Sequence, residues 1–177
     1  MLNIPELRQR TTELKSVLGS LLAAGITTFI LSQRHMGEGL AVVAVIFIPW
    51  LLFKIYDYAK EPEQRRLLVQ KILIWLLAIS LITIIHLVRH HYVRTHAQNI
   101  ADRIQNFADQ HGHYPPDLQS IGTSAAQEKA VLGMFYYGLP DNKGPDAKPD
   151  FFYVATYMHI EVDRYDFATR RWEHVYD

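Results

Sequence analysis

The sequence contains no cysteine, which excludes disulfide bonds, thiolate metal sites and cysteine nucleophiles. It also has no excess of basic charge, because 18 Lys and Arg residues balance 18 Asp and Glu residues. A protein that binds nucleic acid through phosphates needs a basic face, so no nucleic-acid partner is expected. A phosphate-binding glycine loop, a dinucleotide fingerprint, a calcium loop and a nucleophile elbow are also missing from the sequence.

Charge is scarce in three long runs of the N-terminal half, at residues 17–31, 40–53 and 72–88. The first two runs carry no charge, and the only ionisable residue of the third is His86. A membrane span needs about 20 apolar residues, with about 17 as the lower limit. The third run meets this length alone, and apolar flanks complete the other two. We expect three transmembrane helices within residues 17–88; the alternative for the first two is a buried or re-entrant hairpin.

Small residues recur in the first run at the spacing of helix contacts. Gly19 and Ala23 are four residues apart, as are Ser20 and Ala24. Such pairs allow close approach of helix backbones in lipid. The same contacts could join copies of the chain into a homo-oligomer.

Positive charge is distributed unevenly around these runs. Eight Lys or Arg residues precede the first run or lie between the second and third, whereas only three lie close to the runs on the opposite side: Arg34, Arg89 and Arg94. The positive-inside rule therefore places residues 1–16 in the cytoplasm and residues 89–177 outside it. For a bacterial inner membrane, the outer compartment is the periplasm.

The third run continues into a polar helix with one apolar stripe. No Pro or Gly interrupts residues 72–110, which predicts a single helix that leaves the membrane. Arg103 falls away from the stripe. The residues of the stripe recur at spacings of three and four: Val93, Ala97, Ile100, Ile104, Phe107 and Ala108.

The remaining residues predict a small antiparallel sheet packed on this helix. Gly112 favours the end of the helix, and a short helix is expected at residues 125–132. Strands are expected at residues 135–137 and 151–162, followed by a hairpin closed by residues 171–176. The fold class is therefore an α+β membrane protein.

Two surfaces are candidates for binding a partner. Alternation in the strand at residues 151–162 puts Phe152 and Val154 towards the helix, which leaves Tyr153 and Tyr157 exposed. Exposed tyrosines favour protein recognition, because they bury much area at a small entropic cost. The second surface is the acidic loop that ends at residue 150. Its candidate contact residues are Asp141, Asp146 and Asp150.

Histidine and carboxylate residues do not predict a catalytic or metal centre. Four histidines, at residues 86, 90, 91 and 96, surround the end of the third span, with no acidic residue until Asp102. A metal site needs converging ligands, so a polar collar at the membrane surface is the simpler interpretation. Asp163 and Asp166 are expected at turns, and Glu128 on a solvated helix face. No catalytic residue, cofactor or metal is predicted.

Residues 111–118, which read HGHYPPDL, resemble the G-x-Y-P-x-x-L corner of type IV pilin-like and pseudopilin-like domains. The order of a membrane helix, an amphipathic helix and a C-terminal hairpin is similar to the same group over residues 72–177. The corner corresponds to Gly112, Tyr114, Pro115 and Leu118.

This resemblance implies a pilin-like domain held at the membrane. Two spans precede the helix, and residues 68–72 lack the cleavage site and the nearby Glu of pilins, which argues against a fibre subunit. Similar membrane-bound proteins act as immunity proteins against antibacterial toxins, the role favoured here. The alternative is an accessory component of a type IV pilus or secretion system. A metal-dependent membrane enzyme or transporter subunit is a third hypothesis, because His86 lies inside a span.

Overall fold

The computed structural model of the chain describes residues 4–60, 62–140, 148–155 and 161–176. It divides into two compact units, Met1–His86 and Leu87–Asp177. The first holds three long apolar helices, the third of which also extends into the second, and the second holds a four-stranded antiparallel sheet. The predicted α+β fold class is therefore confirmed.

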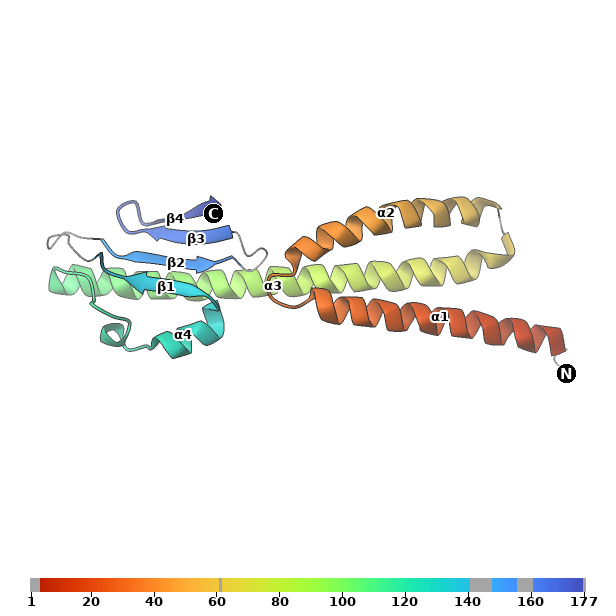
Figure 1. Cartoon of the computed structure of the whole chain (residues 1–177), viewed down its shortest axis with the longest axis horizontal. Helices are drawn as coiled ribbons and strands as arrows, with labels where there is room; N and C mark the ends of the chain where they lie inside the picture. Colours follow the sequence, from red (N-terminus) through yellow and green to blue (C-terminus); the bar gives the residue numbers. More distant parts are fainter. Residues whose placement is uncertain (1–3, 61, 141–147, 156–160, 177) are drawn as a thin grey trace. The chain divides into compact units, whose positions relative to one another are not determined.

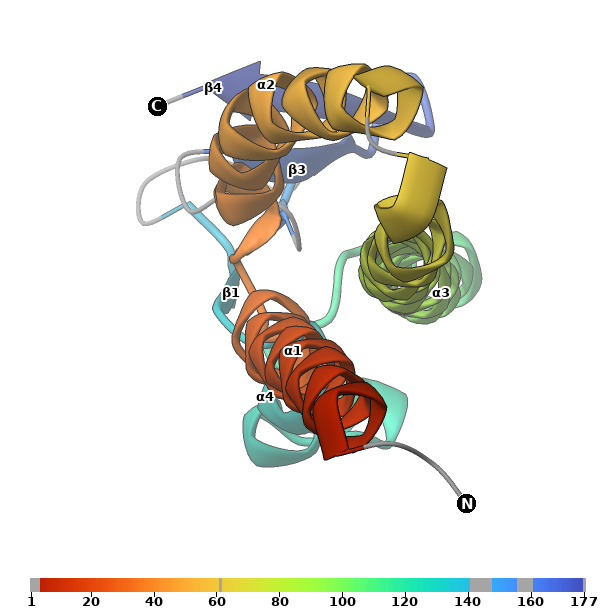
Figure 2. The same cartoon turned by 90° about the vertical axis from the view of Figure 1, so that its right-hand side faces the viewer.

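The first unit consists of α1 (Ile4–Leu31), α2 (Gly37–Lys60), the 3-10 helix η1 (Pro62–Gln64) and the start of α3 (Arg65–His111). By length and composition, all three long helices can cross a membrane, which is consistent with a membrane location. Helix α1 begins at Ile4, so most of the predicted N-terminal segment is helical. Figure 2 looks nearly along α3, and α1 and α2 run obliquely to this view.

Aromatic rings and small residues mediate the contacts of the first unit. The ring centroid of Trp75 on α3 lies 6.2 Å from that of Phe47 and 6.5 Å from that of Trp50, both on α2. Of the predicted small-residue pairs, only the one ending at Ala24 points inward, since Ala24 is buried. At Gly19 an added Cβ would have no neighbour within 4 Å, so this glycine is not needed for close packing.

The second unit packs four strands on the continuation of α3 (Figure 1). The sheet order is β1-β2-β3-β4, and every neighbouring pair is antiparallel. The predicted single strand at residues 151–162 is wrong, because Val154 and Val162 pair with each other on two antiparallel strands. The strand bounds are β1 Phe135–Gly138, β2 Asp150–Val154, β3 Glu161–Asp166 and β4 Arg171–Tyr176.

Four residues of the predicted stripe of α3 form the spine of this core: Val93, Ala97, Ile100 and Ile104. The neighbouring Ala101 is buried with them, whereas Ala108 of the stripe is only half-buried. Phe107 is only half-buried and stacks on His111, one turn further along the helix, at a centroid distance of 4.1 Å. The helix passes beyond the sheet core at this point, so the prediction that Phe107 is a core residue is wrong.

The strand β2 faces α3 with the opposite side from the one predicted. Phe151 and Tyr153 are fully buried, whereas Phe152 and Val154 are half-buried on the outer face. Trp172 of β4 packs against both buried rings, at centroid distances of 5.7 and 5.4 Å. Tyr153 is therefore a core residue and not part of an exposed surface.

The corner after α3 has the helix end that its sequence predicts. The helix ends at His111, and Gly112 follows with a φ of +74°, the left-handed conformation that glycine adopts without steric cost. Pro115 and Leu118 are buried beneath the sheet edge. The chain then forms η2 (Gln119–Ile121) and α4 (Ala125–Leu132), the latter with the predicted bounds.

Candidate partner-binding groove

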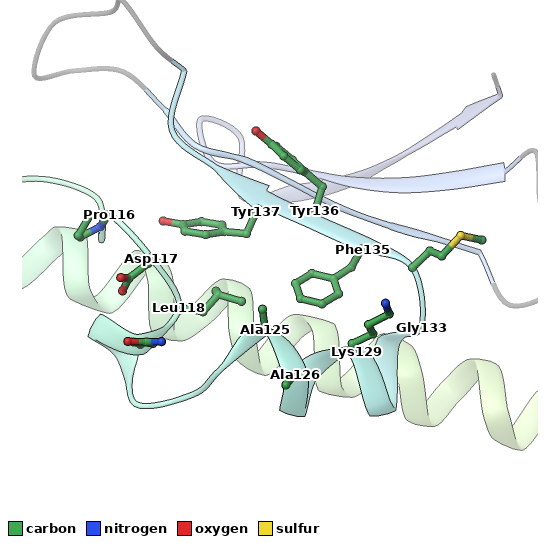
Figure 3. Close-up of a pocket in the computed structure, with 12 residues that line it drawn as sticks. Pro116, Asp117, Leu118, Ala125, Ala126, Lys129, Gly133, Phe135, Tyr136 and Tyr137 are labelled. Atoms are coloured by element: carbon green, nitrogen blue, oxygen red, sulfur yellow. The ribbon is translucent and has the colours of Figure 1, made fainter.

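A groove of about 590 Å³ lies in the second unit between β1 and the segment that precedes it (Figure 3). One wall is formed by residues 116–119, another by α4, and the third by β1. Its volume falls within the usual range of ligand pockets. Ala125 and Ala126 of α4 are exposed at the groove, and their small side chains keep it open.

The local sequence determines where α4 begins and how the chain turns from α4 into β1. Ser124 caps α4 through a reciprocal pair of hydrogen bonds with Gln127, which fixes where the helix begins. Gly133 follows the last residue of α4 with a φ of +81°, so the chain can turn sharply into β1. The groove therefore lies between two elements that are close in sequence and defined by strong local signals.

Aromatic side chains line the β1 side of the groove. Phe135 and Tyr137 are half-buried and pack against the hydrophobic core. The hydroxyl of Tyr137 donates to the carbonyl oxygen of Pro115 at 2.6 Å, and burial raises the pKa of this phenol. The Tyr137 hydroxyl is thus a neutral donor that ties the predicted corner to the sheet edge.

The groove carries one charge of each sign. Lys129 is exposed on α4, and the described residues include no carboxylate in an ion pair with it. Asp117 accepts hydrogen bonds from the backbone N–H and the hydroxyl of Ser120, at 2.9 and 2.8 Å. These bonds lower the pKa of Asp117, so its carboxylate stays ionised at neutral pH.

The strand β1 lies at the edge of the sheet, next to the groove. The backbone N–H of Val154 donates to the carbonyl of Met134 at 2.9 Å, which fixes the hydrogen-bonding phase of the β1–β2 ladder. In an antiparallel pair this phase alternates, so the N–H and C=O groups of Phe135 and Tyr137 point away from β2. An edge of this kind can pair with another chain.

Of the predicted partner-binding residues, the structure describes Tyr153 and Asp150, and neither lines the groove. Tyr153 is in the core, and Asp150 begins β2, where it forms a bidentate ion pair with Arg164 at 2.8 Å. Asp141, Asp146 and Tyr157 lie outside the described residues. The sequence predicts Phe135 and Tyr137 in a strand but does not predict the groove, because the position of residues 116–119 beside β1 is a tertiary property.

Two carboxylates are buried, although the sequence predicts one at a turn and the other on a solvated helix face. Asp163 is 3% exposed and contacts His174 at 2.9 Å and Arg94 at 3.3 Å, so it is not a turn residue. Glu128 is 4% exposed, which corrects its expected solvated position. It lies 2.5 Å from the imidazole of His96 and accepts a hydrogen bond from the hydroxyl of Thr123.

The four histidines of the predicted collar have separate surroundings. His86 is 1% exposed, and its Nε2 lies 2.7 Å from the carbonyl oxygen of Leu31, at the end of α1. His96 contacts Glu128, His90 is half-buried and His91 is exposed. The collar interpretation therefore fails for His86 and His96. Within the part of the chain that the structure describes, no group of three or more His, Asp or Glu side chains could hold a metal ion.

The outer face of the sheet is a second apolar surface. Phe152 stacks on the exposed ring of Tyr136 at 5.4 Å, and the Arg164 guanidinium lies 6.0 Å from the Phe152 ring. Val162 and Val175 pair across β3 and β4 on the same face. Phe152 and Val154, which the sequence predicts to face the helix, therefore lie on this outer face.

Comparison with known proteins adds no relative of this chain. No protein-family model, curated protein or solved structure matches it. The resemblance to pilin-like domains therefore depends only on the sequence of the corner and the order of the elements.

Proposed function

We propose that the chain is a non-catalytic membrane protein whose C-terminal unit binds a protein partner. The observation that carries this proposal is the groove beside β1, where apolar walls, two opposite charges and unpaired backbone groups meet. Apolar clefts with a few polar groups are typical binding sites.

The surroundings of the ionisable groups favour binding over catalysis. Asp163 and Glu128 are each buried beside basic partners on other elements of the fold: Asp163 joins β3 to α3 and β4, and Glu128 joins α4 to α3. Neither carboxylate is among the residues that line the groove. Both groups are accounted for by a structural role.

The location and class of the partner follow from the sequence. The distribution of Lys and Arg favours a cytoplasmic N-terminus and a periplasmic C-terminal unit. Combined with the pilin-like corner, this favours an immunity protein that meets a toxin in the periplasm. An accessory role in a pilus or secretion system is the alternative, and it would use the same groove.

The proposal is tested by photocrosslinking in cells that express the full chain. A photoreactive amino acid at Ala126, inside the groove, should crosslink to a toxin or to a pilus or secretion component. The matched control places it at Ala130, an exposed alanine of the same helix outside the groove lining. Absence of a protein crosslink at Ala126, or equal crosslinking at both positions, would contradict the proposal.

Deletion of the gene then separates the two roles. For an immunity protein, deletion should be lethal only when the crosslinked toxin is present, and Ala126→Trp should reproduce the effect. For an assembly component, deletion should be viable and should abolish piliation or secretion.

A further inference from the structure

The edge of β1 offers backbone hydrogen bonds in a pattern that suits an extended chain. Phe135 and Tyr137 each direct one N–H and one C=O away from β2, two residues apart. Within the described residues, no hydrogen bond joins these backbone groups to the rest of the chain. An incoming strand binds such an edge through every second residue.

The walls of the groove suit the side chains of such a strand. Phe135 and Leu118 are apolar and face the groove from opposite sides in Figure 3, and Ala125 leaves space between them. A strand added to β1 would place alternate side chains into this space, because side chains alternate along a strand. Small β-branched side chains fit a pleated, half-buried site of this kind.

The two ends of the site carry opposite charges. Lys129 lies near Gly133, where β1 begins, whereas Asp117 lies near the Tyr137 end of the strand (Figure 3). A segment antiparallel to β1 would have its C-terminal end near Lys129 and its N-terminal end near Asp117. An acidic residue at the first end and a basic residue at the second would be electrostatically complementary.

We propose that the groove binds an extended segment of the partner as an additional strand, antiparallel to β1, with an acidic C-terminal end at Lys129. This inference rests on the proposed function and specifies how the partner is recognised. The backbone supplies the affinity, and the alternating side chains with their terminal charges supply the specificity.

The test uses the full-length protein in detergent and a labelled peptide of sequence Lys-Val-Thr-Val-Thr-Glu, blocked at both ends. Binding is measured by fluorescence anisotropy for this peptide and for versions methylated at one backbone nitrogen each. Methylation at every second position should weaken binding about tenfold or more, because those N–H groups face β1. Methylation at the intervening positions should change binding by less than about twofold. A tenfold change corresponds to about 1.4 kcal/mol, the upper range for one hydrogen bond.

Three protein variants complete the experiment. Ala126→Trp should block the groove and weaken binding about tenfold or more, whereas the matched variant Ala130→Trp should not. Lys129→Glu should favour a peptide that ends in Lys over the one that ends in Glu. Absence of saturable binding, an equal effect of methylation at all positions, or full binding by Ala126→Trp would overturn the inference.

These outcomes differ from those of the crosslinking experiment. A specific crosslink at Ala126 combined with a uniform effect of methylation would retain the proposed function and reject strand addition. The other outcome is that methylation weakens peptide binding only at every second position, while no partner crosslinks to the chain in cells. That outcome would retain strand addition and reject the proposed function alone.

Discussion

Asp163 joins three elements of the C-terminal unit through a single buried carboxylate. Its Oδ1 lies 2.9 Å from Nδ1 of His174 on β4 and 3.3 Å from the guanidinium of Arg94 on α3. Arg94 also lies 4.9 Å from the ring centroid of Trp172, a distance that suits a cation–π contact. Burial of a carboxylate is costly unless it is paired, so this cluster fixes how the strands sit on the helix.

Removal of this carboxylate should destabilise the C-terminal unit. We expect Asp163→Ala to cost about 2 kcal/mol or more, because it leaves the Arg94 and His174 side chains without their buried partner. Limited proteolysis of the full-length protein in detergent measures the effect as faster cleavage within residues 112–177. The matched control is Asp150→Ala, which removes a more exposed ion pair and should cost about 1 kcal/mol or less. Equal cleavage of both variants would contradict a structural role for Asp163.

The stability of the turn between β3 and β4 should depend on pH through the carboxylate of Asp166. Its carboxylate accepts hydrogen bonds from the hydroxyl of Thr169 and the backbone N–H of Ala168, which lower its pKa from the ordinary value of 3.8. The ionised form is therefore stabilised by folding.

The contribution of Asp166 should be fully present above pH 3.8 and should be lost as the pH falls through the lowered pKa of the folded state. A titration followed by NMR should show a midpoint for Asp166 below that of an unstructured Asp. Asp166→Asn should remove this acid-dependent step. A midpoint at or above the ordinary value would show that the turn does not hold the carboxylate in this way.

Helix α3 has two different surfaces within the C-terminal unit. Ile104 is fully buried against the sheet, whereas Phe107, one turn later, stacks on His111 outside the buried core. The helical period brings both side chains close to one face, but the sheet covers only the first.

Truncation at these two positions should therefore have unequal effects. Ile104→Ala should destabilise the C-terminal unit by about 2–5 kcal/mol, since it creates a cavity in the core. Phe107→Ala should cost less, about 1 kcal/mol, because the ring keeps contact with solvent. Proteolysis of residues 112–177 should be fast in the first variant and close to wild type in the second. The reverse order would mean that the sheet covers a different part of α3.

The end of α3 provides a test of backbone conformation alone. At Gly112 the φ is +74°, and an added Cβ would meet no atom within 4 Å. Gly112→Val should cost about 1–3 kcal/mol through backbone strain, without any steric clash. Gly112→Asn should cost less, since asparagine tolerates the left-handed conformation better. Thermal unfolding of both variants measures the difference, and equal stability would contradict the left-handed cap.

The whole molecule combines three apolar helices with one α+β unit, and the distribution of Lys and Arg predicts its orientation in a membrane. A reporter that is active only outside the cytoplasm should be active when fused after Asp177. The same reporter fused between α2 and α3 should be silent, because five of the Lys and Arg residues that predict a cytoplasmic side lie towards the end of α2 and at the start of α3. The opposite pattern of activity would reverse the proposed orientation.

Several features follow from the sequence alone because each depends on interactions between near neighbours. The apolar runs give the three long helices, Gly112 ends α3, and residues 125–132 form α4 as predicted. Turn chemistry also locates the reversal after Asp166. Helix length, caps and turns involve residues only a few positions apart, so the sequence determines them.

Only the tertiary structure decided which side of β2 faces α3. Phe151 and Tyr153 alternate with Phe152 and Val154, so both sides of the strand are apolar and the period of two does not choose between them. Pairing with β3 and packing on α3 bury the first two residues. Other contacts between residues far apart in the chain bury Glu128 against His96 of α3 and join Pro115 to Tyr137 beside the groove.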